Sequence, residues 1–552
     1  MKKNTRITTL ILTLAMCIAL LASCANGTPA ATSSASPAPS ASAPASASPA
    51  PSAPVPQVVQ TSAPEPPPEN VKFAEEVNII DGTSAISVIN YLSPAGNSMP
   101  THYVYYMIYD RLLEVVGEGE YGPMLATSYE TTDYKTYIFH LRDDVYFHNG
   151  EKFTSADVVY TINSAQATPG VNAYDWWRSV DTVKALDDYT VEIVLTDVNV
   201  MFLYSVTVTA TGIINQKAIE EDPEKGYWVG TGPYTVYDFV SSISVTCAIN
   251  PNYWGRPGVT ERITIWHIPE LSARTIMMQN KESEFAFEIL PEDLHLFQDN
   301  PDYIIIPFIS INIWPLTFNM NDPILSDKNF RLAVAYALRK DEIAYAAAGP
   351  EAVPDEEGTV YGYSTEFRNR DIPPIPYDPV KAKEYLDASI YNGEELEIVV
   401  ALPPNVAAVP MIVSQLNEIG INVRINQMDS PSLRSYVTPT DNNQGQLIFH
   451  TFSPVSNPSN YNSIIRTGAA NNFASYSNPR VDELLEKGPT VTNTEERKAV
   501  YYEIQEIIAE DMPYINLFWK LQFCVAVKGV GGASLNSDMY HDFRYIYQVL
   551  DD

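Results

Sequence analysis

Residues that could do chemistry are few in this chain, and the first group of them is a set of glycines. The segment 117–122 follows an apolar run and carries three glycines in the spacing of a dinucleotide-binding loop. Glu118 and Glu120 inside it would repel a pyrophosphate, and Pro123 stands where a helix should open. We therefore interpret the segment as a glycine-rich turn and not as a phosphate-binding loop.

No other group of catalytic or metal-binding residues stands out. The sequence lacks the nucleophile elbow GxSxG, the zinc motif HExxH and the phosphate loop GxxxxGKS/T. The seven histidines show no helical metal-ligand spacing, and His148 lies in a turn-like segment where a hydrogen-bonding role is favoured over a catalytic one. Asp143, Asp144 and the acidic run 355–357 are typical of solvated loops. We predict no enzyme activity, no metal and no cofactor.

Two cysteines, Cys247 and Cys524, lie in apolar strand-like runs. Buried free thiols are favoured there over a disulfide between them, although the sequence leaves both states open. Four cysteines in 552 residues exclude a disulfide-stapled scaffold.

The composition is that of an acidic globular protein. Lys and Arg total 34 against 67 Asp and Glu, which gives a formal net charge of −33. Such a surface repels phosphate backbones, so no nucleic-acid partner is predicted. Hydrophobic residues make up 45% and charged residues 18%, enough for a large core, and the length suggests three or four units of about 150 residues.

The amino terminus has the pattern of a secretion signal. Basic residues precede an apolar run from Ile7 to Leu21, which spans about 22 Å as a helix and is too short for the ~30 Å hydrocarbon core. The run closes with Leu21-Ala22-Ser23-Cys24, which resembles the bacterial lipobox. We predict that residues 1–23 are a signal peptide and that Cys24 is lipidated.

A tether is expected over residues 24–70. Between Pro29 and Pro56, 26 of 28 residues are Ala, Ser or Pro, and no residue from Ile7 to Pro64 is charged. A chain of this composition cannot bury enough surface to offset the entropy of ordering. We predict an extracytoplasmic protein that reaches the membrane only through its lipid, on the outer face of the cell membrane (the periplasmic side in a Gram-negative cell).

The body alternates strand and helix signals without an internal repeat. Strand-like runs are predicted at 77–80, 136–141, 189–195, 244–249, 396–402 and 420–426. Asn478 and Pro479 begin one predicted helix, which Gly488 ends, and Asn493 with Glu496 begins another. This alternation indicates an α/β or α+β fold.

Nine sequence blocks, in order, resemble the peptide/nickel-type solute-binding proteins of ABC importers, known as family 5. They are YDRLL (109–113), PMLATSY (123–129), YIFHLRDDVYFHNGEKFTSADVVY (137–160), GTGPY (230–234), NYWG (252–255), FRLAVAYALRKDEI (330–343), YDPVKAKEYLD (377–387), EIGINVRI (418–425) and YSNPRVDELL (476–485). Most of these blocks are interpreted as determinants of the fold and not as ligand contacts.

The resemblance implies an α/β, two-lobed fold like that of periplasmic binding proteins, of the large class with an inserted domain. Lobe I would comprise residues 71–117, 206–305 and 520–552, the insertion 118–205, and lobe II 306–519. Two chain crossings near residues 305 and 519 would form the hinge.

The function that the resemblance implies is ligand capture without chemistry. A peptide held between the lobes would favour the closed form, which a monomer would deliver to the transmembrane subunits of an ABC permease. Two alternatives stay open: the same role for a non-peptide solute such as an oligosaccharide, and a surface receptor that senses its ligand.

The expected amine-binding residue is missing. In peptide-binding relatives an Asp shortly after a Gly-Trp pair in lobe II holds the ligand's amine, whereas the matching stretch here, 449–458, contains no acid. No Asp or Glu occurs between Asp441 and Asp482. Glu288, expected at the end of a lobe I strand that faces the cleft in the family, is the possible substitute, and an exposed loop role is an equal alternative.

Seven further residues complete the predicted ligand site, with hinge and core packing as the alternative for the aromatic residues at the crossings. They are Met99, Thr101, Trp314, Asn319, His450, Phe452 and Trp519.

Overall fold

The computed structural model describes residues 66–117, 119–349, 352–355, 367–401, 408–438, 443–451, 458–535 and 541–550. All of them belong to one unit of the chain, residues 57–552. Cys24 and nearly all of the tether fall outside the described residues, so the signal peptide, the lipidation and the tether stay predictions.

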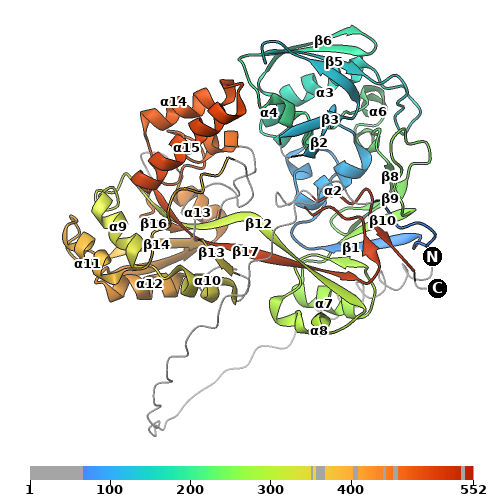
Figure 1. Ribbon diagram of the computed structural model, residues 1–552. Coiled ribbons are helices and arrows are strands. Elements are labelled where there is room, and N and C mark those ends of the chain that lie inside the picture. The colour runs from blue at the N-terminus through green and yellow to red at the C-terminus, as the bar shows by residue number, and fades with distance from the viewer. Residues whose placement is uncertain are drawn as a thin grey trace, which may run out of the picture. The chain divides into compact units, whose positions relative to one another are not determined.

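Eleven strands in the described part of the chain form one mixed sheet (Figure 1). The strands run in the order β15-β14-β16-β12-β17-β11-β1-β10-β9-β8, and β13 pairs with β17. Their bounds are β1 (Glu76–Asp81), β8 (Tyr234–Val240), β9 (Ser244–Ile249), β10 (Arg262–His267), β11 (Phe285–Ala286), β12 (Tyr303–Phe318), β13 (Ala352–Pro354), β14 (Leu396–Ala401), β15 (Val423–Met428), β16 (Leu447–Phe449) and β17 (Tyr514–Val527).

Two long antiparallel strands, β12 and β17, run from one hydrophobic core into another, and we call them the crossing strands. The first core contains Phe308 of β12 and Cys524 of β17, packed with residues of β1, β10 and β11. The second core contains Leu316 of β12 and Leu517 of β17, packed with residues of β14 and β16. These strands supply the two chain crossings that the sequence predicts near residues 305 and 519.

A separate antiparallel sheet lies within the residues predicted for the insertion. Its strands are β4 (Ala126–Glu130), β5 (Thr136–Leu141), β7 (Thr190–Leu195) and β6 (Val180–Asp187), in that order. Alternate residues of β5 and β7 are buried, as expected for strands with one face on a core. A hydrogen bond from the Val200 N–H to the Pro489 carbonyl, 2.9 Å long, links this region to the helices near the carboxyl end.

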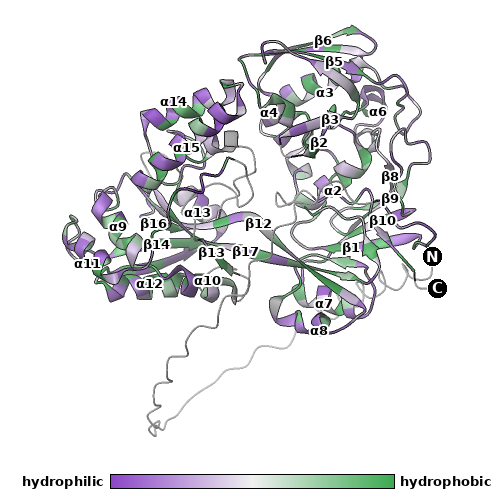
Figure 2. Ribbon diagram, in the orientation of Figure 1, coloured by the Kyte–Doolittle hydropathy of each residue, from purple (hydrophilic) through white to green (hydrophobic). Residues whose placement is uncertain are grey.

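The remaining elements surround these sheets. The helices are α2 (Met99–Ile108), α3 (Ser155–Gln166), α4 (Asn172–Trp177), α5 (Phe202–Ser205), α6 (Gln216–Glu221), α7 (Leu271–Gln279), α8 (His295–Gln298), α9 (Lys328–Ala337), α10 (Lys340–Ala348), α11 (Pro379–Asp387), α12 (Ala408–Glu418), α13 (Ser430–Tyr436), α14 (Pro479–Lys487) and α15 (Thr494–Asp511). Short strands pair as β2 (Leu113–Gly117) with β3 (Glu120–Pro123) and β18 (Val530–Gly531) with β19 (Tyr547–Gln548). Figure 2 shows hydrophilic residues on α11 and α14 and hydrophobic ones along β12 and β17.

Local sequence patterns predicted several helices and turns correctly. Helix α14 begins at Pro479 with the Asn478 side chain accepting from the Arg480 and Val481 amides, and it ends at Gly488. Asn493 caps α15 in the same way. Strand β15 starts at Val423 instead of 420, because Gly420 has a φ of 95° in the turn that follows α12. The glycine pattern at 117–122 is the turn between β2 and β3, with Gly119 at a φ of 70°.

One buried carboxylate joins three of the sequence blocks. Asp110 accepts hydrogen bonds from the Thr231 hydroxyl at 3.0 Å, the Tyr253 hydroxyl at 3.1 Å and the Trp254 Nε1 at 2.9 Å. The predicted turn role of His148 is confirmed in the same region, since its ring bonds to backbone atoms of Gly230 and Gly232. The contacts of Asp110 therefore hold these three blocks together.

The two cysteines are free and buried in the structure. Burial raises the pKa of the Cys247 thiol to about 12 and that of Cys524 well above its ordinary value.

Candidate ligand-binding site

Side chains that can bind a ligand collect at the carboxyl ends of parallel strands, and the large sheet has two such edges. In the first, β10, β1 and β11 are parallel and end at His267, Asp81 and Ala286. In the second, β15, β14 and β16 are parallel and end at Met428, Ala401 and Phe449. We call these the first edge and the second edge.

The two edges point toward one another along the crossing strands. The register places Phe285 and Ala286 of β11 in line with Ile304 and Ile305 of β12, so β11 runs in the same direction as β12, toward the second core. Strand β16 is antiparallel to β12, so it runs toward the first core. About ten residues of β12 separate the two ends, or roughly 30 Å of extended strand, and the loops and side chains fill part of that distance.

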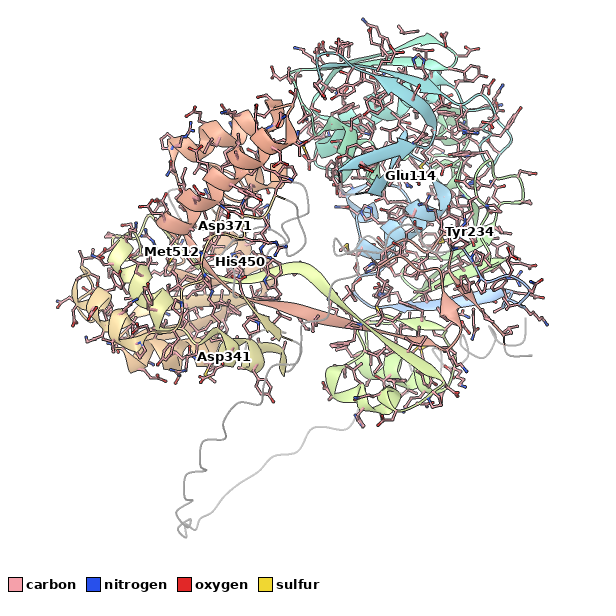
Figure 3. All side chains as sticks on the ribbon, in the orientation of Figure 1. Glu114, Tyr234, Asp341, Asp371, His450 and Met512 are labelled. Carbon is pink, nitrogen blue, oxygen red and sulfur yellow. The ribbon has the colours of Figure 1, made fainter. Side chains whose placement is uncertain are left out.

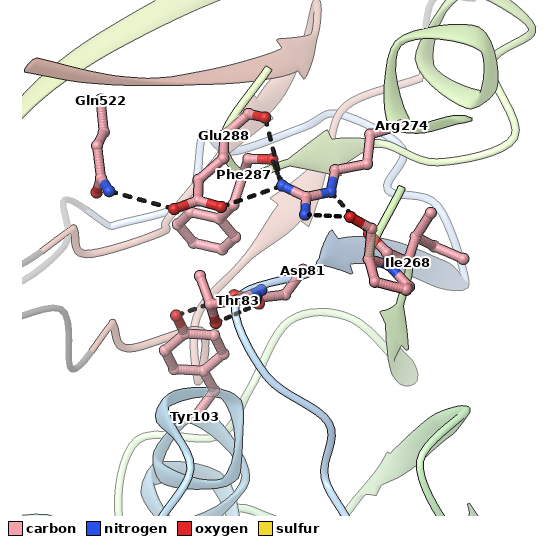
Figure 4. Close-up of polar contacts among 9 residues, drawn as sticks. Asp81, Thr83, Tyr103, Ile268, Arg274, Phe287, Glu288 and Gln522 are labelled. Atoms are coloured by element: carbon pink, nitrogen blue, oxygen red, sulfur yellow. Dashed lines mark hydrogen bonds and ion pairs between the residues drawn. The ribbon is translucent and has the colours of Figure 1, made fainter. Parts of the chain in front are cut away.

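Glu288 lies at the first edge, two residues beyond β11, and its carboxylate is engaged (Figure 4). Its Oε2 is 3.2 Å from Nη1 of Arg274, and its Oε1 accepts from the Gln522 amide at 3.2 Å. Arg274 has only 2% of its side chain exposed, whereas Glu288 has 29% exposed. Glu288 therefore keeps free acceptor positions that a ligand can reach.

A second carboxylate, that of Asp81, is buried beside this pair. It accepts from the Thr83 amide at 2.7 Å, from the Thr83 hydroxyl at 2.6 Å and from the Tyr103 hydroxyl at 3.1 Å. Burial raises the pKa of Asp81 to about 6, and the charge of Glu288 contributes to the rise. The Asp81 and Glu288 carboxylates and the Arg274 guanidinium together carry a net charge of −1 when Asp81 is ionised.

Replacing Asp81 by Asn is expected to change how stability depends on pH. The unfolded carboxyl ionises near pH 3.8 while the folded one keeps its proton to about pH 6, so the free energy of unfolding should fall as the pH rises between these values. The loss amounts to about 3 kcal/mol and stays constant above pH 6. Urea denaturation from pH 4 to pH 7 should show the variant gaining about this much relative to the wild type. A difference that is constant over the whole range would contradict the prediction.

Two predicted residues lie at the start of α2, next to the first edge. Thr101 is fully buried, and its hydroxyl is hydrogen-bonded to that of Ser98. Met99 is half-buried and packs against the first core.

Three residues predicted at the crossings pack against other parts of the protein, with Trp519 and Asn319 buried and Trp314 half-buried. Trp314 stacks on Phe518 with ring centroids 5.9 Å apart, and the Trp519 indole donates to Asp355 at 3.3 Å. The amide of Asn319 donates to the Gly445 carbonyl at 2.7 Å. These placements agree with the packing alternative for the tryptophans, and the assignment of all three to the ligand site stays a prediction.

His450 lies at the second edge, one residue beyond β16 (Figure 3). Its Nε2 is 3.1 Å from the Thr317 hydroxyl and its Nδ1 is 3.1 Å from the Thr451 carbonyl. Burial lowers the pKa of the ring to about 4, so the imidazole is neutral at neutral pH. Phe452 falls outside the described residues.

The structure thus brings Glu288 together with residues that sequence reasoning missed. Asp81 follows the strand-like run 77–80 directly, and this position was a usable signal. Arg274 and Gln522 carried none, because nothing local marks a helix arginine or a strand glutamine as buried. Among the described residues, no group of three His, Cys, Asp or Glu is arranged to hold a metal ion.

Two facing edges of parallel strands joined by crossing strands define a two-lobed ligand-binding protein. Comparison with known proteins agrees: residues 120–473 match the family described as "Bacterial extracellular solute-binding proteins, family 5 Middle". The chain belongs to this family, so it is a solute-binding protein that works with an ABC transporter. The predicted family and fold class are confirmed.

Similar proteins differ in what their names say they bind. Heme-binding protein A of Haemophilus influenzae is 26% identical over 449 residues, covering 74% of this chain and 81% of that protein. Glutathione-binding protein GsiB of Escherichia coli K12 is 26% identical over 434 residues, covering 74% and 82%. The structure of the periplasmic binding protein DppA from Helicobacter pylori, in complex with the peptide STSA, has a TM-score of 0.70 at 22% identity and covers 87% and 99%.

The family is one of extracellular solute-binding proteins, and it is a binding family and not an enzymatic one. No helix in the described ranges has both the length and the apolar character needed to cross a membrane.

Proposed function

We propose that this protein captures peptides between its two lobes and delivers them to an ABC permease, as a lipid-anchored monomer on the outer face of the cell membrane. The observation that carries the proposal is the partly exposed carboxylate of Glu288 at the first edge. Two similar proteins support peptides as the ligand class: the DppA structure contains a bound peptide, and GsiB is named as a glutathione-binding protein. The lipid anchor rests on Cys24 and its surrounding residues.

A peptide needs an acceptor for its terminal ammonium, and the first edge offers one. Lobe II has no acid between Asp441 and Asp482. Glu288 accepts one bond on each oxygen from Arg274 and Gln522, and each carboxylate oxygen can accept two. The neighbouring charge of Asp81 makes the group net negative, so an ammonium is attracted there.

Replacing Glu288 by Ala is expected to weaken binding of a free-amine tetrapeptide by about tenfold to a hundredfold, because a charge-assisted hydrogen bond is lost. The acetylated form of the same peptide should bind the variant and the wild type alike. Isothermal titration calorimetry measures both. Glu288→Gln, which keeps the shape of the side chain, should show the same selective loss.

A matched control is Glu261→Ala, which removes an exposed acid just before β10. It should leave both affinities unchanged. An equal loss for the free and acetylated peptides in Glu288→Ala would argue against amine binding by Glu288. A wild-type protein that binds no peptide would refute the proposed ligand class.

The oligosaccharide alternative is less well supported by the packing. Stacking on sugar rings needs exposed aromatic faces, whereas Trp519 is 1% exposed and the half-buried Trp314 has one face stacked on Phe518. The described part of the site therefore favours a ligand bound through polar groups.

A further inference from the structure

Asp81 is a buried carboxyl group without a cation of its own. The residue is 1% exposed, and it makes no ion pair with any residue that the structure describes. Its three hydrogen bonds come from neutral donors, two of them from Thr83 and one from Tyr103. An ionised carboxylate buried without a countercharge is costly, so a cation that arrives near Asp81 is attracted to it.

The Glu288–Arg274 pair beside Asp81 is neutral by itself. Arg274 lies 3.2 Å from the Glu288 carboxylate and also donates to four backbone carbonyls, which fix the position of its guanidinium. Figure 4 shows Asp81 between Tyr103 of α2 and this pair. The excess negative charge that attracts an ammonium to Glu288 therefore depends on whether Asp81 is ionised.

Asp81 changes its charge within a cluster of other titratable and charged groups. Those on the elements packed around it are His267 of β10, Tyr103 of α2, Arg274 of α7, Glu288 after β11 and Cys524 of β17. Burial and the charge of Arg274 lower the pKa of His267, and burial raises the pKa values of Tyr103 and Cys524 well above their ordinary range. These three side chains are therefore neutral at pH 7, whereas Asp81 gains its charge near pH 6.

A proton on Asp81 has a way out of the protein. Asp81, Ser84 and His267 line a small pocket at the ends of β1 and β10, which has room for about one water molecule. The pocket is partly open to solvent, so the proton can leave without local unfolding.

We propose that Asp81 sets the charge preference of the first edge by exchanging its proton for the ligand's ammonium. The inference rests on the proposed function, since it needs a peptide whose amine is held by Glu288. When the ammonium binds, the O–H bond of the Asp81 carboxyl breaks, its electron pair stays on the carboxylate and its proton goes to solvent. The charges of the two carboxylates, the guanidinium and the ammonium then sum to zero. Asp81 acts through the field at Glu288 and is a positioning residue for charge, without touching the ligand.

The exchange makes binding depend on pH. An ammonium several ångström from a carboxyl group weakens proton binding there by about tenfold at an effective dielectric constant of about 20. Affinity for a free-amine peptide should therefore rise about fivefold from pH 5 to pH 7.5, because Asp81 is mostly protonated at the lower pH and ionised at the higher. Binding should release about half a proton at pH 5.5 and almost none at pH 7.5.

Isothermal titration calorimetry with tetra-alanine and its N-acetylated form tests the exchange. Titrations in two buffers that differ in their heat of ionisation give the number of protons released. The wild-type protein should release about half a proton at pH 5.5 with the free-amine peptide and none with the acetylated one. Binding of tetra-alanine without proton release, or equal release with both peptides, would overturn the inference and leave peptide binding intact.

Asp81→Asn removes the group that exchanges a proton and keeps the size of the side chain. The variant should release no proton at pH 5.5. It should bind tetra-alanine about tenfold more weakly than the wild type at pH 7.5 and within about twofold of it at pH 5. A purely structural effect would weaken binding by the same factor at both pH values, and that result would overturn the role of Asp81.

Two control variants separate Asp81 from other groups that titrate in this range. Asp157 of α3 is also a buried carboxyl group whose pKa is raised by burial to about 6, and it lies within the predicted insertion. Asp157→Asn and His267→Gln should both release protons as the wild type does. Loss of the release in either control would assign it to that group and overturn the inference. A wild-type protein that binds no tetra-alanine at any of these pH values would refute the proposed function itself, and this inference with it.

Discussion

Replacing Asp110 by Ala is expected to lower the free energy of unfolding by about 3–5 kcal/mol. The carboxylate is fully buried and accepts from Thr231, Tyr253 and Trp254. Its removal leaves these donors without their acceptor, at about 1–3 kcal/mol each and less than additively. Urea denaturation followed by circular dichroism measures the change.

The control for Asp110 is an acid of the same type on the surface. Asp143 is exposed, and Asp143→Ala should change stability by no more than about 0.5 kcal/mol. If Asp110→Ala cost no more than Asp143→Ala, the carboxylate would not be what joins the three sequence blocks.

The second large effect is expected from Arg274→Met, with a loss of about 3–5 kcal/mol. The guanidinium is buried and donates to the carbonyls of Ile268 at 2.7 Å and of Pro269, Phe287 and Glu288 at 3.3 Å each, besides the Glu288 carboxylate. Methionine fills similar space and donates to none of them. Glu288 also has a φ of 51°, so the segment that these bonds hold is in an unfavourable conformation.

Two further variants test whether the buried hydrogen bonds of Arg274 provide this stability. A methyl group at Gly82 would lie 1.9 Å from the Arg274 Nη2 and 2.2 Å from the Ile268 carbonyl oxygen, so Gly82→Ala should also destabilise the protein. Arg178→Met, at an exposed position, should leave stability within about 0.5 kcal/mol. A similar small effect for Arg274→Met and Arg178→Met would mean that the buried bonds contribute little.

The candidate ligand site was predictable only in part. Glu288 and His450 each lie just beyond a strand of an edge, and this position relative to a strand can be inferred from a chain. The direction of a side chain on the crossing strands cannot, because successive residues of a strand point to opposite faces and the pairing decides which face is inside. Trp519 was expected in the ligand site and is 1% exposed, bonded to Asp355, which is 164 residues away in sequence.

The sequence by itself determined the class of fold and the caps of α14 and α15, because these depend on short-range preferences of the chain. It also showed the nine ordered blocks, because such blocks contain residues that meet wherever this fold forms. Asp110 shows why such blocks are informative: it needs Thr231, Tyr253 and Trp254 as partners. Only the tertiary structure decided the composition of the site. The site combines Asp81 of β1, Arg274 of α7, Glu288 just after β11, and Gln522 of β17. These residues meet because strand pairing aligns their segments at one edge of the sheet.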